Sequence, residues 1–326
     1  MAPIECNVEV EGKQLIRTRI IEYPSELSRV RPLWEELYRR DGGTMFQSFV
    51  WNETAARVFA SREAMRIVVV DGAVAAIVPA CMKPIGNVCL IGESLFDYRD
   101  VLCSDPELLP RAWEVLAGWQ RNFDVTALRS HKHWGGFRLE PFAKAPAILH
   151  DGVTAEQFLS SQRRLGRHSR RLRKHGLSLH RHSGANRALI ETIYQRKGNE
   201  AVNLFNDRLR RDFMAEICSR PESRCEVFTY ETAGELVAAL VTFRDDSVRR
   251  FYTTYFDERW ASLSPGQLLL FEVAADALAE GLDCDFMTGE YPYKMRLATD
   301  SVQLYRANAT PEQLRELGRG PTTIAA

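Results

Sequence analysis

The residues Ser264-Pro265-Gly266-Gln267 have the types and spacing of a helix start that can bind an anion. Serine suits the cap of a helix, proline its first position, and a glutamine three residues after the cap can bond back to the cap amide. The first amides of a helix lack partners within it, and the positive end of the helix dipole lies there, so phosphate oxygens bind readily at such a turn. A capped helix without a ligand is the alternative, and it is the commoner of the two.

The segments around this turn predict a mixed α/β unit. Three strand-like runs precede it, and the short polar links between them favour an antiparallel meander. At Ser264 the apolar period changes from two to that of a helix, which Gly281 ends, and a short strand follows. The three runs are Cys225 to Tyr230, Leu236 to Phe243 and Val248 to Phe256, and the short strand is Asp285 to Met287.

The amino-terminal half also alternates strand and helix patterns. Gln14 to Glu22 alternates as a strand would, and apolar runs on either side of Asp71-Gly72 predict a hairpin. A chain of 326 residues has room for two domains of about 150 residues each. We therefore expect an amino-terminal domain at 1–150 and a carboxy-terminal domain at 151–326.

A long cationic helix is expected from about Thr154 to Gly176. Phe158, Leu165 and Leu172 recur every seven residues, which leaves a narrow apolar stripe and a wide cationic surface. That surface is either a solvated face or a contact for the phosphates of a large donor, or for an anionic polysaccharide or lipid. Gly166 weakens the helix and predicts a bend. The cations, with no acidic residue among them, are Arg163, Arg164, Arg167, Arg170, Arg171, Arg173 and Lys174.

Composition limits the classes of function. Lys plus Arg and Asp plus Glu each number 43, so the chain as a whole has no long-range field that favours nucleic acid or an anionic membrane. The 7 scattered cysteines fit reduced thiols better than a disulfide framework or a zinc site. The pairs His131/His133 and His180/His182 have no third type of ligand near them in the sequence, so we expect no metal.

Several familiar signatures are missing from the sequence. It contains no nucleophile elbow, Walker loop or dinucleotide fingerprint, which argues against hydrolase, kinase and dehydrogenase functions. The first residues lack the basic and apolar regions of a signal peptide, and no apolar run reaches the length needed to cross a bilayer. We therefore expect a cytoplasmic protein without a transmembrane segment.

Short motifs that are dense between about Leu236 and Arg296 carry a family resemblance. They are Leu236-Val237-Ala238-Ala239, Tyr255-Phe256-Asp257, Ser264-Pro265-Gly266, Leu268-Leu269-Leu270, Gly281, Asp285-Phe286, Gly289-Glu290 and Pro292-Tyr293-Lys294. In this order they resemble the CelD-like acyltransferase family of the GNAT superfamily, which is related to the FemAB transferases. Phe46-Gln47-Ser48, Trp51 and the Arg-rich helix are similar to earlier parts of the family pattern.

The resemblance implies an α/β (α+β) fold of two tandem GNAT-like (acyl-CoA N-acyltransferase) domains, with mixed, largely antiparallel sheets flanked by helices. The first domain lacks a comparable turn, so we expect it to be degenerate and to serve the acceptor site or the packing of the pair. In the superfamily the turn usually contains a second glycine or an alanine, whereas this chain has one glycine, so the donor can differ from plain acetyl-CoA. The residues implied to bind the donor are Ser264, Gly266, Gln267 and Leu268.

The same resemblance implies roles for three residues after the last strand. Glu290 would accept the proton of the attacking amine, and Tyr293 would protonate the leaving sulfur. Lys294 would orient a carboxylate or a phosphate. The alternatives are a surface carboxylate or one paired with Lys294, a packed tyrosine with a bonded hydroxyl, and a solvated lysine.

The implied reaction moves an acyl group from a CoA thioester to an amine or a sugar hydroxyl, in polysaccharide or cell-envelope biosynthesis. Acyl-CoA is the expected co-substrate, no metal is expected, and the acceptor is a small molecule or a saccharide. Two alternatives stay open. One is a FemAB-type transferase that takes an aminoacyl group from tRNA, and the other is a non-catalytic component of a polysaccharide synthesis complex.

Overall fold

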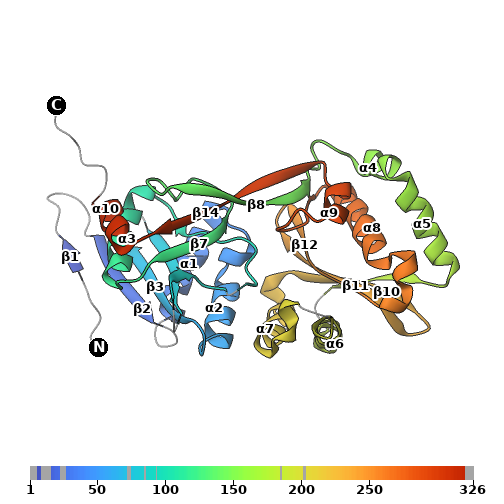
Figure 1. Cartoon of the computed structure of the whole chain (residues 1–326), viewed down its shortest axis with the longest axis horizontal. Helices are drawn as coiled ribbons and strands as arrows, with labels where there is room; N and C mark the ends of the chain where they lie inside the picture. Colours follow the sequence, from blue (N-terminus) through green and yellow to red (C-terminus); the bar gives the residue numbers. More distant parts are fainter. Residues whose placement is uncertain are drawn as a thin grey trace. The chain divides into compact units, whose positions relative to one another are not determined.

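The computed structural model describes residues 6–8, 16–22, 27–71, 75–83, 86–92, 94–183, 186–200 and 203–319 (Figure 1). The chain forms two compact units. Unit 1 contains Met1–Phe142 and Leu304–Ala326, and unit 2 contains Ala143–Gln303. None of the helices in the described ranges is both long and apolar enough to cross a membrane.

Unit 1 is a mixed sheet with helices. In spatial order its strands are β1 (Cys6–Val8), β2 (Ile16–Glu22), β3 (Ala64–Asp71), β4 (Ala76–Met82), β5 (Val88–Leu90), β7 (Phe123–Leu128) and the end of β14 (Asp300–Ala309), with β6 (Leu102–Cys103) beside β4. Neighbouring strands are antiparallel except β5 and β7. The helices are α1 (Leu27–Asp41), α2 (Phe49–Val58), α3 (Leu109–Gly118) and α10 (Pro311–Gly318).

The predicted hairpin of unit 1 is confirmed as the antiparallel pair of β3 and β4, although Gly72 of the predicted turn lies outside the described residues. The strand expected at Gln14 to Glu22 is described from Ile16 as β2. The unit has its own core, where Trp113, Phe123 and Trp134 are at most 2% exposed.

Unit 2 also consists of mixed β-strands, with helices on both faces. Its strands run in the order β8 (Leu139–Ile148), β13 (Asp283–Asp285), β12 (Val248–Phe256), β11 (Glu235–Asp245), β10 (Cys225–Thr232) and β9 (Ser178–Ser183). Only β12 and β13 pair in parallel; the other neighbours are antiparallel. The helices are α4 (Ala155–Ser161), α5 (Arg163–Lys174), α6 (Arg187–Gly198), α7 (Arg208–Ser219), α8 (Pro265–Ala279) and α9 (Pro292–Leu297). Figure 1 shows α5 and α8 on one face of this sheet and α6 and α7 on the other.

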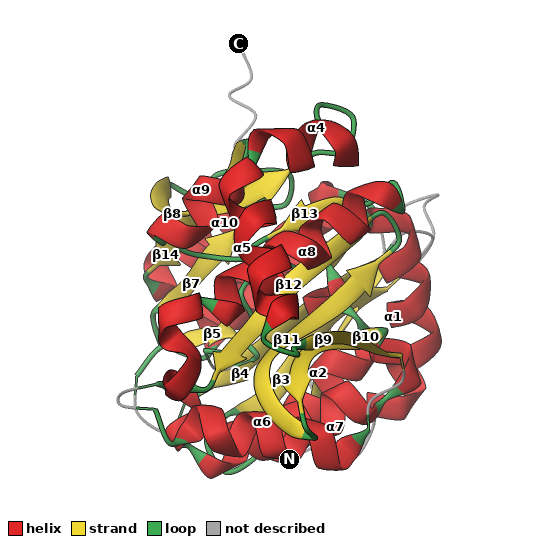
Figure 2. Ribbon diagram, turned by 90° about the vertical axis from the view of Figure 1, so that its right-hand side faces the viewer, coloured by secondary structure: helices red, strands yellow, loops and turns green. Residues whose placement is uncertain are grey.

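The central helix of unit 2 is α8, which packs on the strands of the meander (Figure 2). It begins with a proline, whose missing N–H costs nothing at a helix start. Its apolar residues point in several directions, and Leu268, Leu269, Val273 and Ala274 are all 0% exposed. Since a buried leucine side chain stabilises the fold by about 2 kcal/mol, α8 is fixed firmly in the core. The predicted meander of β10, β11 and β12 and the helix after it are confirmed.

Three expectations differ from the structure. The expected boundary between 150 and 151 is replaced by crossings at 142/143 and 303/304, because β14 pairs with β7 and returns the chain to unit 1. The long helix is two helices, α4 and α5, which break at Gln162 and not at Gly166. The last short strand lies two residues earlier than expected, at Asp283–Asp285.

Candidate donor-binding site

The candidate site lies where β12 and β13 separate. Their parallel pairing covers three residue pairs and ends at Arg250 and Asp285. Beyond this point β12 continues to Phe256, whereas β13 stops and the chain turns away. Thr254 and Phe256, on the part of β12 that still pairs with β11 but no longer with β13, line a pocket next to α8. Two parallel strands that diverge in this way leave exposed backbone at the end of a sheet, where a ligand can lie.

Asp285 holds the segment that follows β13. Its carboxylate pairs with the buried Arg250, and its Oδ1 accepts a hydrogen bond of 2.8 Å from the amide of Met287. Met287 has a φ of 64°, in the left-handed region that side chains rarely adopt. These contacts give Asp285 a structural role.

The predicted capping box at Ser264 is wrong. Ser264 has φ 50° and ψ 49°, and its side chain makes no cap hydrogen bond. A capping side chain needs an extended backbone, but Ser264 also ends the 3-10 helix η5 (Glu258–Leu263) and turns the chain in the left-handed conformation. The amide of Gln267 therefore donates no bond to the serine oxygen, and the Gln267 side chain makes no bond back to the amide of Ser264.

The turn consequently presents free donors. Pro265 has no N–H, and the amide of Leu268 donates to the carbonyl of Ser264 at 3.1 Å. Among the described residues, no acceptor bonds the amides of Gly266 or Gln267. These two N–H groups lie at the positive end of a helix of 15 residues. This is the arrangement that binds phosphate oxygens at helix starts.

A pocket of about 340 Å³ lies beside these amides. Ligand pockets are about 300 to 1,000 Å³, so this one suits a small ligand or part of a larger one. A Cβ on Gly266 would lie 3.3 Å from both Thr254 and Phe256, so glycine is needed here for close packing of α8 on β12. The lining residues are Lys197, Thr254, Phe256, Ala261, Ser264, Gly266, Gln267, Leu270 and Tyr293.

The side chain of Gln267 adds a third unused donor. Its Nε2 atom is buried and has no hydrogen-bond partner within the described part of the chain. A buried amide without a partner costs about 1 to 3 kcal/mol, so such groups in native proteins usually meet a ligand or a water. Gln267 thus joins the two free amides as a group that a bound anion or carbonyl would satisfy.

The predicted donor-binding residues are brought together except for Leu268. Ser264, Gly266 and Gln267 line the pocket. Leu268 does not line it, since its side chain lies in the core and its amide is already bonded.

Of the three predicted catalytic residues, Tyr293 alone lines the pocket. Its ring stacks on Tyr291 with centroids 5.9 Å apart. Burial, with a smaller effect of Tyr291, raises the pKa of Tyr293, so its hydroxyl keeps its proton. Glu290 is exposed, and its Oε1 lies 3.7 Å from Nζ of Lys144. Lys294 donates to the carbonyl of Thr288 at 2.9 Å, so it supports the loop before α9.

Lys197 is a lining residue that sequence reasoning missed. It lies near the end of α6, and its Nζ atom is 2.5 Å from Oε2 of Glu200. No sequence motif connects α6 with the turn at Gly266; only the fold brings them to one pocket. Because the ammonium of Lys197 is already paired with Glu200, an anion in the pocket would compete with that carboxylate for it.

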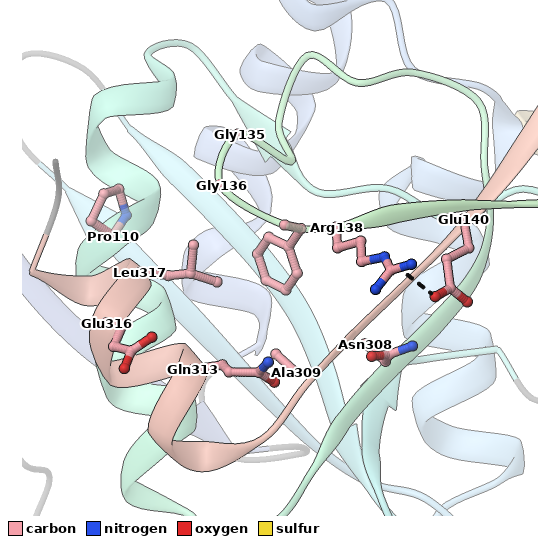
Figure 3. A pocket seen from close by; sticks show the side chains of 11 residues that line it. Pro110, Gly135, Gly136, Arg138, Glu140, Asn308, Ala309, Gln313, Glu316 and Leu317 are labelled. Carbon is pink, nitrogen blue, oxygen red and sulfur yellow. Dashed lines mark ion pairs between the residues drawn. The ribbon is translucent and has the colours of Figure 1, made fainter.

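A larger cavity, of about 730 Å³, lies in unit 1 (Figure 3). Its wall includes Gly135, Gly136 and Arg138 from the loop before β8, and Gln313 and Leu317 from α10. Arg138 there pairs with Glu140 at 3.8 Å, and the Arg138 side chain is 90% exposed. Because this cavity has neither a free helix start nor a predicted site residue, its greater volume does not make it the better donor site.

Residues 160–295 match the family model described as an acetyltransferase (GNAT) domain. This range includes the turn and the whole pocket lining. No curated protein matches the sequence significantly.

Solved structures show the fold at low sequence identity. FemX is similar with a TM-score of 0.57 and 10% identity, over 81% of this chain and 92% of that one. The C-terminal domain of a protein described as a putative lysylphosphatidylglycerol synthetase, from Agrobacterium fabrum, is similar with a TM-score of 0.58 and 11% identity, over 89% of this chain and 95% of that one. A tandem GNAT protein from the clavulanic acid biosynthesis pathway is similar with a TM-score of 0.50 and 11% identity, over 90% of this chain and 98% of that one. The chain therefore has a tandem GNAT fold of mixed sheets flanked by helices.

Proposed function

We propose that the protein is an acyltransferase that moves an acyl group from a CoA thioester to an amine or a sugar hydroxyl. The observation that carries this proposal is the pair of unbonded amides, Gly266 and Gln267, at a pocket beside separating strands. The match of residues 160–295 to the GNAT model supports the same reading. The CelD-like subfamily, a cytoplasmic location and a role in envelope polysaccharides belong to this proposal as expectations.

The residues present fit the diphosphate of such a donor. The amides of Gly266 and Gln267 would bind its oxygens, and Lys197 would contribute positive charge. When bound, the donor would supply the acyl group and a thiolate leaving group.

The proton transfers would fall to Glu290 and Tyr293. Glu290 would take the proton of the attacking amine or hydroxyl, through a water because its carboxylate is exposed. Tyr293 would give its proton to the leaving sulfur, for which its raised pKa keeps the hydroxyl ready. The new bond joins the acyl carbon to the acceptor, the carbon–sulfur bond breaks, and the proton that Tyr293 loses is replaced from solvent.

Donor binding tests this function directly. A ligand that binds only the folded protein raises its stability, by about 2.7 kcal/mol at a concentration of 100 Kd. We expect CoA and acyl-CoA to raise the Tm of the wild type. Gly266→Val should abolish the shift, because its side chain would press on Thr254 and Phe256 in the pocket.

Gly166→Ala is the matched control. Gly166 also lies within a helix of unit 2, but a Cβ there meets nothing within 4 Å. This variant should keep the donor-induced shift and gain a little stability from its better helix propensity. The proposal fails if no CoA thioester shifts the Tm of the wild type, or if Gly266→Val folds and still responds.

One observation favours a second function, transfer of an aminoacyl group from tRNA. Arg173 of α5 pairs with Glu272 at 3.0 Å, whereas the side chains of the other cations of this helix form no ion pair or hydrogen bond with any described residue. Phosphates of an RNA would neutralise such a row of charges. Charged tRNA and acyl-CoA should therefore be compared as competitors: protection by tRNA alone would favour the second function.

A further inference from the structure

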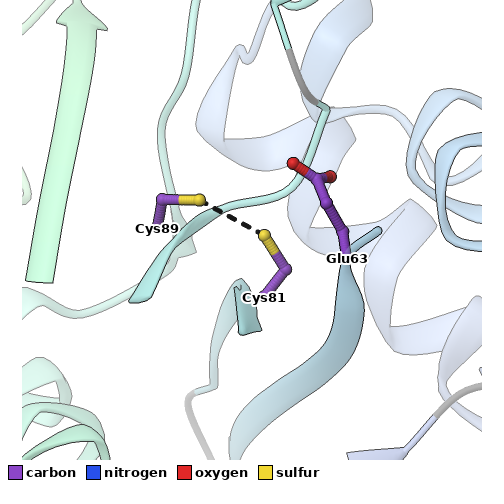
Figure 4. A group of neighbouring side chains, drawn as sticks. All are labelled: Glu63, Cys81 and Cys89. Carbon is purple, nitrogen blue, oxygen red and sulfur yellow. Dashed lines mark hydrogen bonds between the residues drawn. The ribbon is translucent and has the colours of Figure 1, made fainter. Parts of the chain in front are cut away.

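Cys81 and Cys89 face each other across two strands of unit 1 (Figure 4). They are direct register partners in the antiparallel pair β4 and β5, and their Sγ atoms lie 3.3 Å apart. Opposed residues in such a ladder have Cα atoms about 4.5 to 5.5 Å apart, inside the range of about 4.4 to 6.8 Å that disulfides span. The backbone is therefore already placed for a bond between the two sulfurs.

The two thiols differ in access and in proton affinity. Cys81 is 0% exposed, whereas Cys89 is half-buried. Their mutual hydrogen bond is the main cause that raises the pKa of Cys81 and lowers that of Cys89, with Lys83 and Arg99 also favouring a thiolate at Cys89. Since the thiolate is the reactive form, Cys89 is the thiol that a reagent from solvent would meet first.

Glu63 completes the group. Its carboxylate and the two sulfurs offer ligand atoms within 4.8 Å of one another, and its Oε2 accepts a hydrogen bond from the amide of Gly92. Its negative charge raises the pKa of both thiols, so it disfavours their thiolate forms. In the described part of the chain this group has three ligands, one fewer than a structural zinc site uses. Thiol chemistry, which needs only the two cysteines, fits the geometry better than a metal.

We propose that Cys81 and Cys89 are a modification site at which a small-molecule disulfide oxidises the pair to an intramolecular disulfide. The Cys89 thiolate attacks one sulfur of the reagent, whose S–S bond breaks and releases one thiolate. Cys81 then loses its proton to solvent and attacks Sγ of Cys89, which expels the second thiolate. Two protein thiols are oxidised, and the reagent is reduced to two thiols.

The full-length reduced protein, treated with oxidised glutathione after chelator treatment, tests this proposal. We expect the intact mass to fall by two hydrogens and peptide mapping to join the Cys81 and Cys89 peptides. A second neighbouring pair, Cys218 and Cys225, is buried in unit 2 and serves as an internal control that should react far more slowly.

Single variants separate the two steps. Cys81→Ser should trap a stable glutathione adduct on Cys89, because the resolving thiol is gone. Cys89→Ser should form no adduct on the buried Cys81. Glu63→Gln, which keeps an acceptor for Gly92, should react several-fold faster than the wild type because both thiols ionise more readily.

Three results would overturn the proposal. They are a link between other cysteines, an adduct on Cys81 in preference to Cys89, and a wild type that reacts only when denatured. Reaction that appears only after the chelator has removed a bound ion would also overturn it, in favour of a metal site. Far-ultraviolet circular dichroism of each variant shows whether the fold is retained, so a failure to fold is recognised as such.

Discussion

Arg250 of β12 and Asp285 of β13 form a buried ion pair at the last register position before the two strands separate. The side chains of Arg250 and Asp285 are 3% and 8% exposed, and Arg250 also contacts Asp245. The pair thus fixes the point where the sheet opens beside the pocket, and its removal should disturb both the fold and the donor site.

Asp285→Ala should lower the free energy of unfolding by about 3 kcal/mol, because it leaves a buried guanidinium with one carboxylate fewer. Asp285→Asn should cost less, since its amide oxygen can still accept from Met287. Urea unfolding measures both. Asp246→Ala, which breaks an exposed pair with Arg224, is the control and should change stability by about 0.5 kcal/mol or less. Equal losses in Asp285→Ala and Asp246→Ala would contradict the assigned role.

Gln267→Leu should leave the free protein as stable as the wild type or slightly more stable, because it removes a buried amide that has no partner. The same change should weaken donor binding roughly tenfold, corresponding to about 1.4 kcal/mol for one lost hydrogen bond. Isothermal titration with CoA and urea unfolding together measure the two effects. A large loss of stability without a loss of affinity would show that Gln267 has a purely structural task.

Tyr293→Phe should lower kcat about 100-fold while the stacking on Tyr291 is kept. Since the pKa of Tyr293 is raised, the activity of the wild type should fall only above about pH 10, and this alkaline limb should vanish in the variant. Tyr291→Phe is the matched control, because Tyr291 does not line the pocket. If Tyr293→Phe and Glu290→Ala both leave the cellular phenotype unchanged, the non-catalytic alternative gains support.

His133 makes the stability of unit 1 depend on pH. Burial lowers the pKa of His133, but contacts with Asp100 at 3.1 Å and Asp41 at 3.3 Å raise it overall to about 9. The charged ring therefore stabilises the fold fully below pH 6.5, and this contribution is lost as the pH rises to about 9. We expect His133→Gln to cost about 3 kcal/mol at pH 6 and progressively less toward pH 9.

The sequence predicted the elements of unit 2 well because their signals are local. The change of apolar period at Ser264 and the alternation of the three strands before it depend on residues close in the chain. The cap geometry was wrong for a reason that is not local: Ser264 also ends η5, which has no apolar period to reveal it. Free amides at the start of this helix were predicted. The side chain of Ser264, which was expected to cap the helix, makes no cap bond, and this helps to leave the amide of Gln267 free.

Other features could not be predicted because they depend on tertiary contacts. Lys197 reaches the pocket from a helix that carries no related motif. The sequence does not show that Cys81 and Cys89 are neighbours, because their proximity depends on the register of β4 and β5. The resemblance to GNAT proteins located the turn and Tyr293, but it left Leu268 in the core and Glu290 exposed to solvent.

The return of β14 to unit 1 determines the order in which the chain can fold during its synthesis. All of Ala143–Gln303 leaves the ribosome before the part of β14 that pairs with β7, Tyr305 to Ala309, and before α10, which covers α3. Domains usually fold as units, in the order in which they emerge. Unit 2 is therefore complete first. Unit 1 exposes part of its apolar surface until the end of β14 and α10 have been synthesised.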